Sequence, residues 1–175
     1  MSTLSRARAA GALATLALVP LALGSAGAAE RVDGGDVKAL GASLALERAA
    51  IKAYADALAA NVLSPPVAAV ITRFSNEHAA QRDAIVAALS QASATVPTDE
   101  APLDAESFKT EGDVLAYAYS LERTIAGSYV KSVGPYKNRD YATLAASILG
   151  VTTTHVALLA AALRSGAPYP GGLVT

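Results

Sequence analysis

Two histidines and two glutamates of this chain stand where the surrounding pattern places the inner faces of helices. These residues are Glu47, His78, Glu122 and His155. A buried carboxylate without a partner is unfavourable, so such a group is normally paired, protonated or bound to a metal ion. If the four side chains meet in one core, they could hold a divalent cation, or they could bond to one another without one.

Further polar residues accompany them. Gln81 lies on the same inner face as His78, and Thr152 lies on that of His155, whereas Glu77 is expected on a flank that faces solvent. Glu77 and Gln81 are additional candidate ligands, because either could complete a set that is short of donors. Four tyrosines could donate hydrogen bonds to these groups, although aromatic residues at helical spacing usually serve packing, and no catalytic role is assigned to them. They are Tyr54, Tyr117, Tyr119 and Tyr129.

Four amphipathic helices are expected to position these side chains, because apolar residues recur at helical spacing in four segments. The predicted helices run over about 36–60, 66–91, 113–133 and 140–164. Asp36 is the expected N-cap of the first helix, behind a turn at Gly34 and Gly35. The chain nearly lacks the period-two alternation of strands, so the predicted fold class is all-α.

The segment 92–112 has no apolar period and contains prolines, which indicates a long irregular connection. A four-helix bundle with one long crossover uses such a segment to carry the chain along a helix. In that topology, at about 1.5 Å per residue, the four core residues lie roughly 14 to 22 Å from a helix end. They are therefore expected to meet near the middle of the bundle.

Four motifs, in this order and with the long connection after the second, resemble the exported bacterial ferritin-like domain family, which is related to desiccation-associated ferritin-like proteins. The motifs are Glu47 to Tyr54, Phe74 to Ala84, Leu121 to Ile125 and Ile148 to Leu159. The resemblance implies a ferritin-like four-helix bundle with a lone glutamate on the first and third helices and Glu-x-x-His on the second and fourth.

Only part of that family pattern is present. Glu47 and Glu122 match the lone glutamates, and His155 matches the histidine of the fourth helix. The two pairs read His78-x-x-Gln81 and Thr152-x-x-His155, so carboxylates and an imidazole are missing. A di-iron centre takes about six protein ligands. The resemblance therefore leaves open one ion or an impaired pair, and it does not decide whether the chain is an enzyme with ferroxidase activity.

The N-terminal segment predicts export. Arg6 and Arg8 precede an apolar run over 11–23, and small residues follow at 25–29. This is the layout of a secretory signal peptide, here assigned to residues 1–28, with the bundle over 29–175. The run is shorter than the roughly 20 residues that a membrane span needs. We therefore expect a periplasmic or secreted protein with no membrane span after cleavage.

Composition narrows the function further. The chain has no cysteine, so a thiolate metal site is excluded, and its net charge of −1 provides no basic stripe for nucleic acid. Three functional classes remain open. The first is a metal-binding protein in iron or manganese handling or oxidative stress defence, where zinc also fits the ligands. The second is a metal-free structural or stress-protective module, and the third is a bundle that forms a homo-oligomer.

Overall fold

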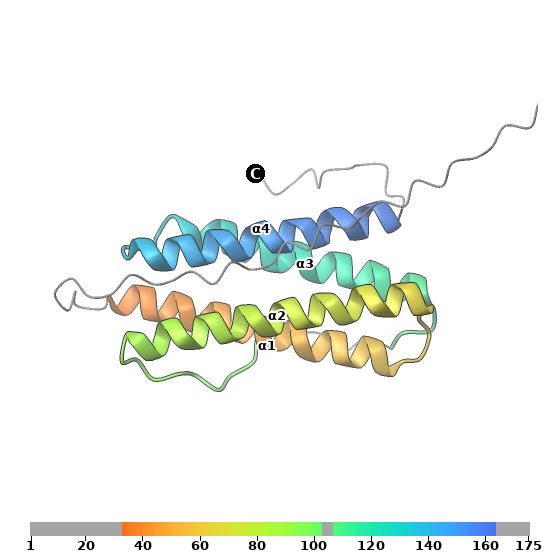
Figure 1. The fold of residues 1–175 in the computed structure, drawn as a ribbon, viewed down its shortest axis with the longest axis horizontal. Helices are drawn as coiled ribbons and strands as arrows, with labels where there is room; N and C mark the ends of the chain where they lie inside the picture. Colours follow the sequence, from red (N-terminus) through yellow and green to blue (C-terminus); the bar gives the residue numbers. More distant parts are fainter. Residues whose placement is uncertain (1–32, 103–106, 164–175) are drawn as a thin grey trace, which may run out of the picture.

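The structure, a computed structural model, describes residues 33–102 and 107–163. Within these residues it contains four helices and no strand, and Figure 1 shows that they form a bundle. The helices are α1 (Gly34–Ala59), α2 (Pro65–Gln91), α3 (Glu111–Val133) and α4 (Arg139–Ala162). The predicted all-α four-helix bundle is confirmed, with helix boundaries close to those expected. The predicted signal peptide lies outside the described residues and stays a prediction.

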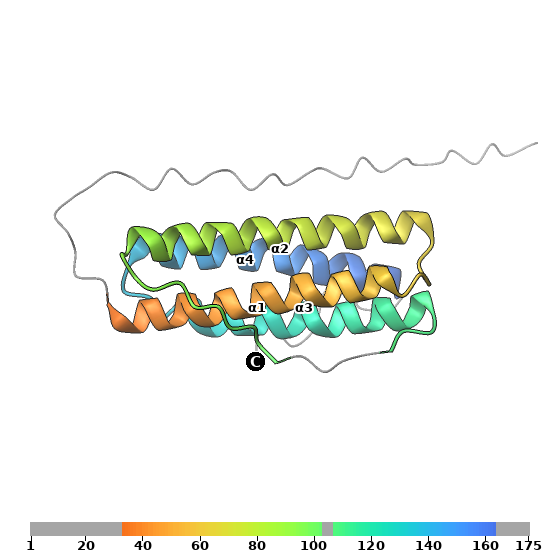
Figure 2. The same ribbon diagram turned by 90° about the horizontal axis from the view of Figure 1, so that it is seen from below.

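The bundle consists of two helical hairpins. The helices α1 and α2 pack along each other, as do α3 and α4, whereas the hairpins meet more sparsely through α1 with α3 and α2 with α4. The long connection returns the chain beside α1, so that α3 begins at the end where α2 began (Figure 2). Arg48 donates a hydrogen bond to the carbonyl oxygen of Pro97, and the amide of Ala101 donates to Ala45 at 3.0 Å.

The start of α1 differs from the expectation. Asp33, not Asp36, is the N-cap, and its carboxylate accepts from the amide of Gly35 at 2.8 Å. Gly34 and Gly35 belong to the first helical turn rather than to a turn before it. Asp36 is instead buried, and it accepts from the amides of Lys137 at 3.0 Å and Asn138 at 2.8 Å. This carboxylate ties the start of α1 to the connection between α3 and α4.

The opposite end of the bundle has a similar tie. Glu111, in the first turn of α3, accepts from the amide of Ser64 at 2.6 Å, which joins α3 to the connection between α1 and α2. Thr110 and Asp113 form a capping box that fixes where α3 begins. The two hairpins are therefore joined by carboxylates at both ends.

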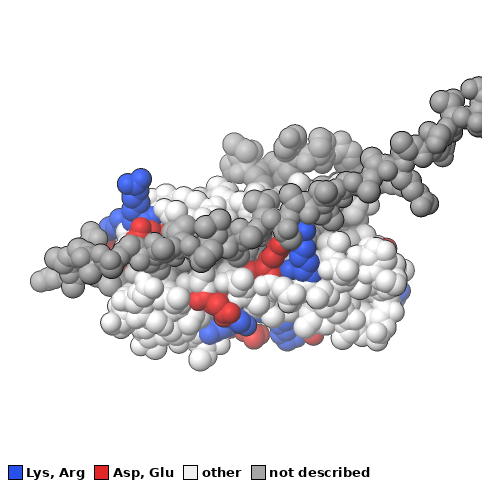
Figure 3. Space-filling view, in the orientation of Figure 1, with Lys and Arg blue, Asp and Glu red and all other residues white. Residues whose placement is uncertain are grey.

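The helix α4 carries few charged residues. By length and composition this helix could cross a membrane, but the core helices of soluble proteins share this property. Of its most apolar 18-residue stretch, 39% is buried in the bundle. On the face shown in Figure 3, acidic and basic side chains lie close together among uncharged surface. Neither charge dominates the part of that face that the described residues form.

Candidate metal centre

One residue from each helix contributes to a polar cluster in the middle of the bundle. Glu47 comes from α1, His78 from α2, Glu122 from α3 and His155 from α4, and each is at most 1% exposed. The helical period turns these residues inward, and the crossover topology brings them to the same height. The structure thus brings together the four side chains that the sequence singled out.

Each imidazole of the cluster lies between two carboxylates. The Nδ1 atom of His78 is 2.6 Å from Glu47 Oε2, and its Nε2 atom is 3.0 Å from Glu122 Oε1. The Nδ1 atom of His155 is 3.1 Å from the same Glu122 oxygen, and its Nε2 atom is 2.5 Å from Glu77 Oε2. Glu122 is therefore the one carboxylate that both imidazoles contact among the described residues.

Two of the four tyrosines take part in the cluster. Tyr54 of α1 donates to Glu122 Oε1, and Tyr129 of α3 donates to Glu47 Oε1 at 2.5 Å. Each tyrosine follows the glutamate of its own helix by seven residues and bonds to the glutamate of the other helix. This repeated spacing in the sequence could have separated the two from Tyr117 and Tyr119. Tyr117 instead packs against Phe108, and Tyr119 lies under Arg123.

Glu77 does not face solvent, contrary to the expectation from the sequence. Its side chain is only 18% exposed, and besides His155 it contacts the Nε atom of Arg73 at 2.9 Å. The flank of α2 that carries Glu77 faces α4, where the hairpins meet. Phe74, three residues earlier, stacks on the His155 ring with centroids 3.9 Å apart. A solvated face was expected because the sequence pattern of α2 alone does not show what packs on its flanks.

Gln81 and Thr152 are buried without contributing to the contacts between imidazoles and carboxylates. The hydroxyl of Thr152 donates to the carbonyl oxygen of Ile148 in its own helix at 3.0 Å. Both amide atoms of Gln81 lack a hydrogen-bond partner, as does Glu122 Oε2. The positions at which the family pattern has a histidine and a carboxylate are thus a free amide and a hydroxyl bonded to its own helix.

The contacts shift the protonation of the cluster. Burial alone would lower the pKa of His78, but the carboxylates of Glu122 and Glu47 outweigh it and raise this pKa to about 10. Burial alone would raise the pKa of Glu122, but His78 and His155 lower it to about 2. Burial and the adjacent glutamates raise the pKa of Tyr54 and of Tyr129, so both phenols remain hydrogen-bond donors. The core therefore stabilises positive charge beside Glu122.

The donor atoms suit one metal ion. His78, Glu122 and His155 each offer a buried ligand atom, and these three atoms lie within 4.8 Å of one another. Glu122 also has an oxygen without a partner. Imidazole nitrogen and carboxylate oxygen are ligands of zinc and of iron. A second ion does not fit equally well, because the oxygens of Glu47 bond to Tyr129 and His78 and the hydroxyl of Thr152 bonds to its own helix.

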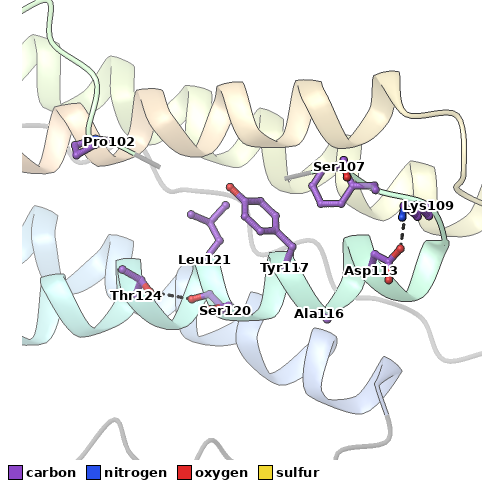
Figure 4. Close-up of a pocket in the computed structure, with 10 residues that line it drawn as sticks. Pro102, Ser107, Lys109, Asp113, Ala116, Tyr117, Ser120, Leu121 and Thr124 are labelled. Carbon is purple, nitrogen blue, oxygen red and sulfur yellow. Dashed lines mark hydrogen bonds between the residues drawn. The ribbon is translucent and has the colours of Figure 1, made fainter. Parts of the chain in front are cut away.

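A separate cavity of about 780 Å³ lies beside α3 (Figure 4). Tyr117 and Leu121 point from α3 toward α1, and Asp113 bonds to the backbone of Lys109. Pro102 and Ser107, which flank the undescribed residues 103–106, also line this cavity. None of the candidate ligands does so, and the cavity is not part of the polar cluster.

Comparison with known proteins agrees with the fold. A family model described as a ferritin-like domain matches residues 35–165. The structure is similar to the crystal structure of a conserved hypothetical protein from Mycobacterium tuberculosis, with a TM-score of 0.66 and 22% identity. The similarity covers 75% of this chain and 92% of that one, and at this identity it supports the fold alone. No curated protein matches the chain.

Proposed function

Because the chain belongs to the ferritin-like domain family, we propose that its core binds a single divalent metal ion through His78, Glu122 and His155. The observation that carries the proposal is the convergence of three buried donor atoms within 4.8 Å of one another. Two imidazoles and one carboxylate with open positions are the ligand set of many non-haem iron(II) sites, so iron is the proposed ion. Zinc and manganese are the competing ions.

Glu47 and Glu77 support this site without belonging to the donor group. Each carboxylate contacts the imidazole nitrogen that faces away from Glu122. A carboxylate in that position fixes the tautomer and orientation of a metal-binding histidine. Tyr129 and Arg73 in turn hold these two carboxylates. Glu47 thus departs from the family pattern, in which the glutamate of the first helix is itself a ligand, and Glu77 has no counterpart in that pattern.

A bound ion would supply a redox or Lewis-acid centre in the closed core. Each Fe(II) gives up one electron, so the two-electron reduction of dioxygen uses a pair of iron ions. The half of the core around Gln81 and Thr152 lacks the donors for the second ion. We therefore place the protein in iron handling or oxidative defence as a single-ion binder. A metal-free structural module is the second candidate, favoured by the fact that the imidazoles already have carboxylate partners.

Thermal unfolding separates these two candidates. Metal-free protein is titrated with Fe(II) under anaerobic conditions, and with Mn(II) and Zn(II). A site ion stabilises the fold by about 2.7 kcal/mol at a hundredfold excess over the dissociation constant. The midpoint should therefore rise with increasing ion concentration in the wild type and in Asp56→Ala, a surface control, but not in His155→Ala. If no ion raises the midpoint, the structural module is correct.

We also propose that the protein acts outside the cytoplasm, as its resemblance to exported ferritin-like proteins suggests. The support is the charged, apolar and small-residue order of residues 1–28. Mass spectrometry of the protein from its own host should find a chain that begins near residue 29. An intact Met1 on exported material would contradict the predicted cleavage.

A further inference from the structure

An apolar cavity adjoins the polar cluster through Phe74. The cavity measures about 430 Å³, and the start of α2, the start of α3 and the end of α4 line it with residues that include Val70, Leu115 and Leu159. Phe74 lines it as well and also stacks on the His155 ring. Pockets that bind small molecules typically measure about 300–1,000 Å³ and are mostly apolar. The volume and the lining therefore suit a small apolar ligand.

Arg73 gives this cavity one cationic side. It is the only charged side chain among the described residues that line the cavity. Its Nε atom donates to Glu77 at 2.9 Å, whereas its terminal amino groups have no partner within the described part of the chain. A guanidinium has five N–H donors in a planar fork, so one carboxylate on Nε leaves donors for a second.

We propose that this cavity binds an aliphatic carboxylate. The apolar chain of the ligand lies against Val70, Leu115 and Leu159, and its carboxylate bonds to the free amino groups of Arg73. A sugar or nucleotide would leave hydroxyl or amide groups without partners against this wall, which is unfavourable for each buried group. An aliphatic amine would place its positive charge beside the guanidinium.

The cavity does not depend on a metal ion. None of His78, Glu122 and His155 lines it, so binding can be measured on metal-free protein and remains testable if the proposed function is wrong. It is coupled to the cluster through two neighbours, since Arg73 contacts Glu77 and Phe74 contacts His155. An occupant would hold Phe74 against the His155 ring.

Calorimetric titration of the full, metal-free chain tests the proposal with three probes that share one alkyl chain. Decanoate should bind, 1-decanol should bind at least tenfold more weakly, and decyltrimethylammonium should not bind, all below their aggregation concentrations. Equal affinity for the three probes would show that Arg73 recognises no head group and would overturn the proposal. Failure of decanoate to bind would overturn it too, and would leave the cavity to residues of the chain itself.

Three variants check the same assignment, each with its helical content measured by circular dichroism. Arg73→Gln should weaken decanoate binding at least tenfold. Arg82→Gln is the matched control on the same helix, because Arg82 pairs with Asp83 and does not line the cavity, and it should bind decanoate as the wild type does. Ala162→Phe, which adds a ring to the cavity lining, should abolish binding. Unchanged affinity in Arg73→Gln or Ala162→Phe would overturn the proposal.

Discussion

Glu47 and Glu122 occupy equivalent places in the two hairpins, yet their surroundings differ. Both are buried, and each accepts a hydrogen bond from the tyrosine of the opposite hairpin. Glu47 uses its two oxygens for Tyr129 and one imidazole. Glu122 contacts both imidazoles and Tyr54 through one oxygen, and its second oxygen has no partner. Equal residue type and burial thus do not give equal chemistry.

The difference arises from the helices that face each glutamate. Glu122 has His155 opposite it on α4, whereas the corresponding position on α2 is Gln81, an amide without a partner. We call Glu47 and its contacts the Glu47 half of the core, and Glu122 and its contacts the Glu122 half. The Glu47 half therefore has the contacts of a structural pair, and the Glu122 half has those of a binding site. The four predictions that follow test whether this asymmetry is real.

The largest effect is expected from Glu122→Gln. The substitution removes the anionic donor, so added metal should no longer raise the unfolding midpoint. It also takes a charged partner from two buried imidazoles, and the metal-free protein should lose about 3–5 kcal/mol of its free energy of unfolding. Urea denaturation and calorimetric metal titration measure the two effects. Wild-type metal affinity in this variant would show that Glu122 is not a ligand.

Glu47→Gln should weaken metal binding less than Glu122→Gln does. If Glu47 only orients His78, its loss should weaken metal affinity by about 10–100-fold and leave one ion per chain. Calorimetric titration measures both the metal affinity and the number of ions per chain in a single experiment. Complete loss of binding, equal to that of Glu122→Gln, would make Glu47 a ligand and remove the contrast between the two halves.

Substitution of the two tyrosines should lower the free energy of unfolding equally but change metal affinity unequally. Tyr54→Phe and Tyr129→Phe each remove a buried hydrogen bond to a carboxylate, at a cost of about 1.5–3 kcal/mol in the metal-free protein. Tyr54 contacts the proposed ligand Glu122, whereas Tyr129 contacts Glu47, so Tyr54→Phe should weaken metal affinity more than Tyr129→Phe. Denaturation and titration of the pair check this, and equal effects on metal affinity would contradict it.

The smallest effect is expected from Gln81→Met. A buried amide without partners is replaced by an apolar side chain of similar shape, which should raise the free energy of unfolding by about 1 kcal/mol. Gln91→Met, at the exposed end of the same helix, is the control and should change little. A loss of stability in Gln81→Met would mean that the amide serves the Glu47 half after all.

Much of the fold and of the cluster could be predicted from the sequence. The helical period determines the inward face of each helix, and the single long connection determines the direction of α3, so the convergence of the four core residues followed from both. The pairing within the cluster could not be predicted. Face and height do not specify which nitrogen of His78 meets which carboxylate, and Glu77 was misplaced because its environment depends on α4.

Asp36 shows a second limit. An aspartate after two glycines has the sequence pattern of an N-cap, and the pattern does not reveal that a distant connection offers two backbone amides. Only the packed tertiary structure brings Lys137 and Asn138 to that carboxylate. The predicted N-cap, Asp36, lies about one helical turn after the observed one, Asp33, for this reason, although the helix itself was correctly predicted.

The carboxylate ties at the two ends of the bundle also restrict its motions. Asp36 and Glu111 each accept hydrogen bonds from backbone amides of the other hairpin, so the two hairpins are held together at both ends of the bundle. Two elements fixed at both ends separate most easily between the fixed points, and the hairpins pack more sparsely on each other than the helices within each hairpin do. Glu77 is the one carboxylate of the cluster that is partly exposed, at 18%, so we expect an ion or proton to enter the core past Glu77.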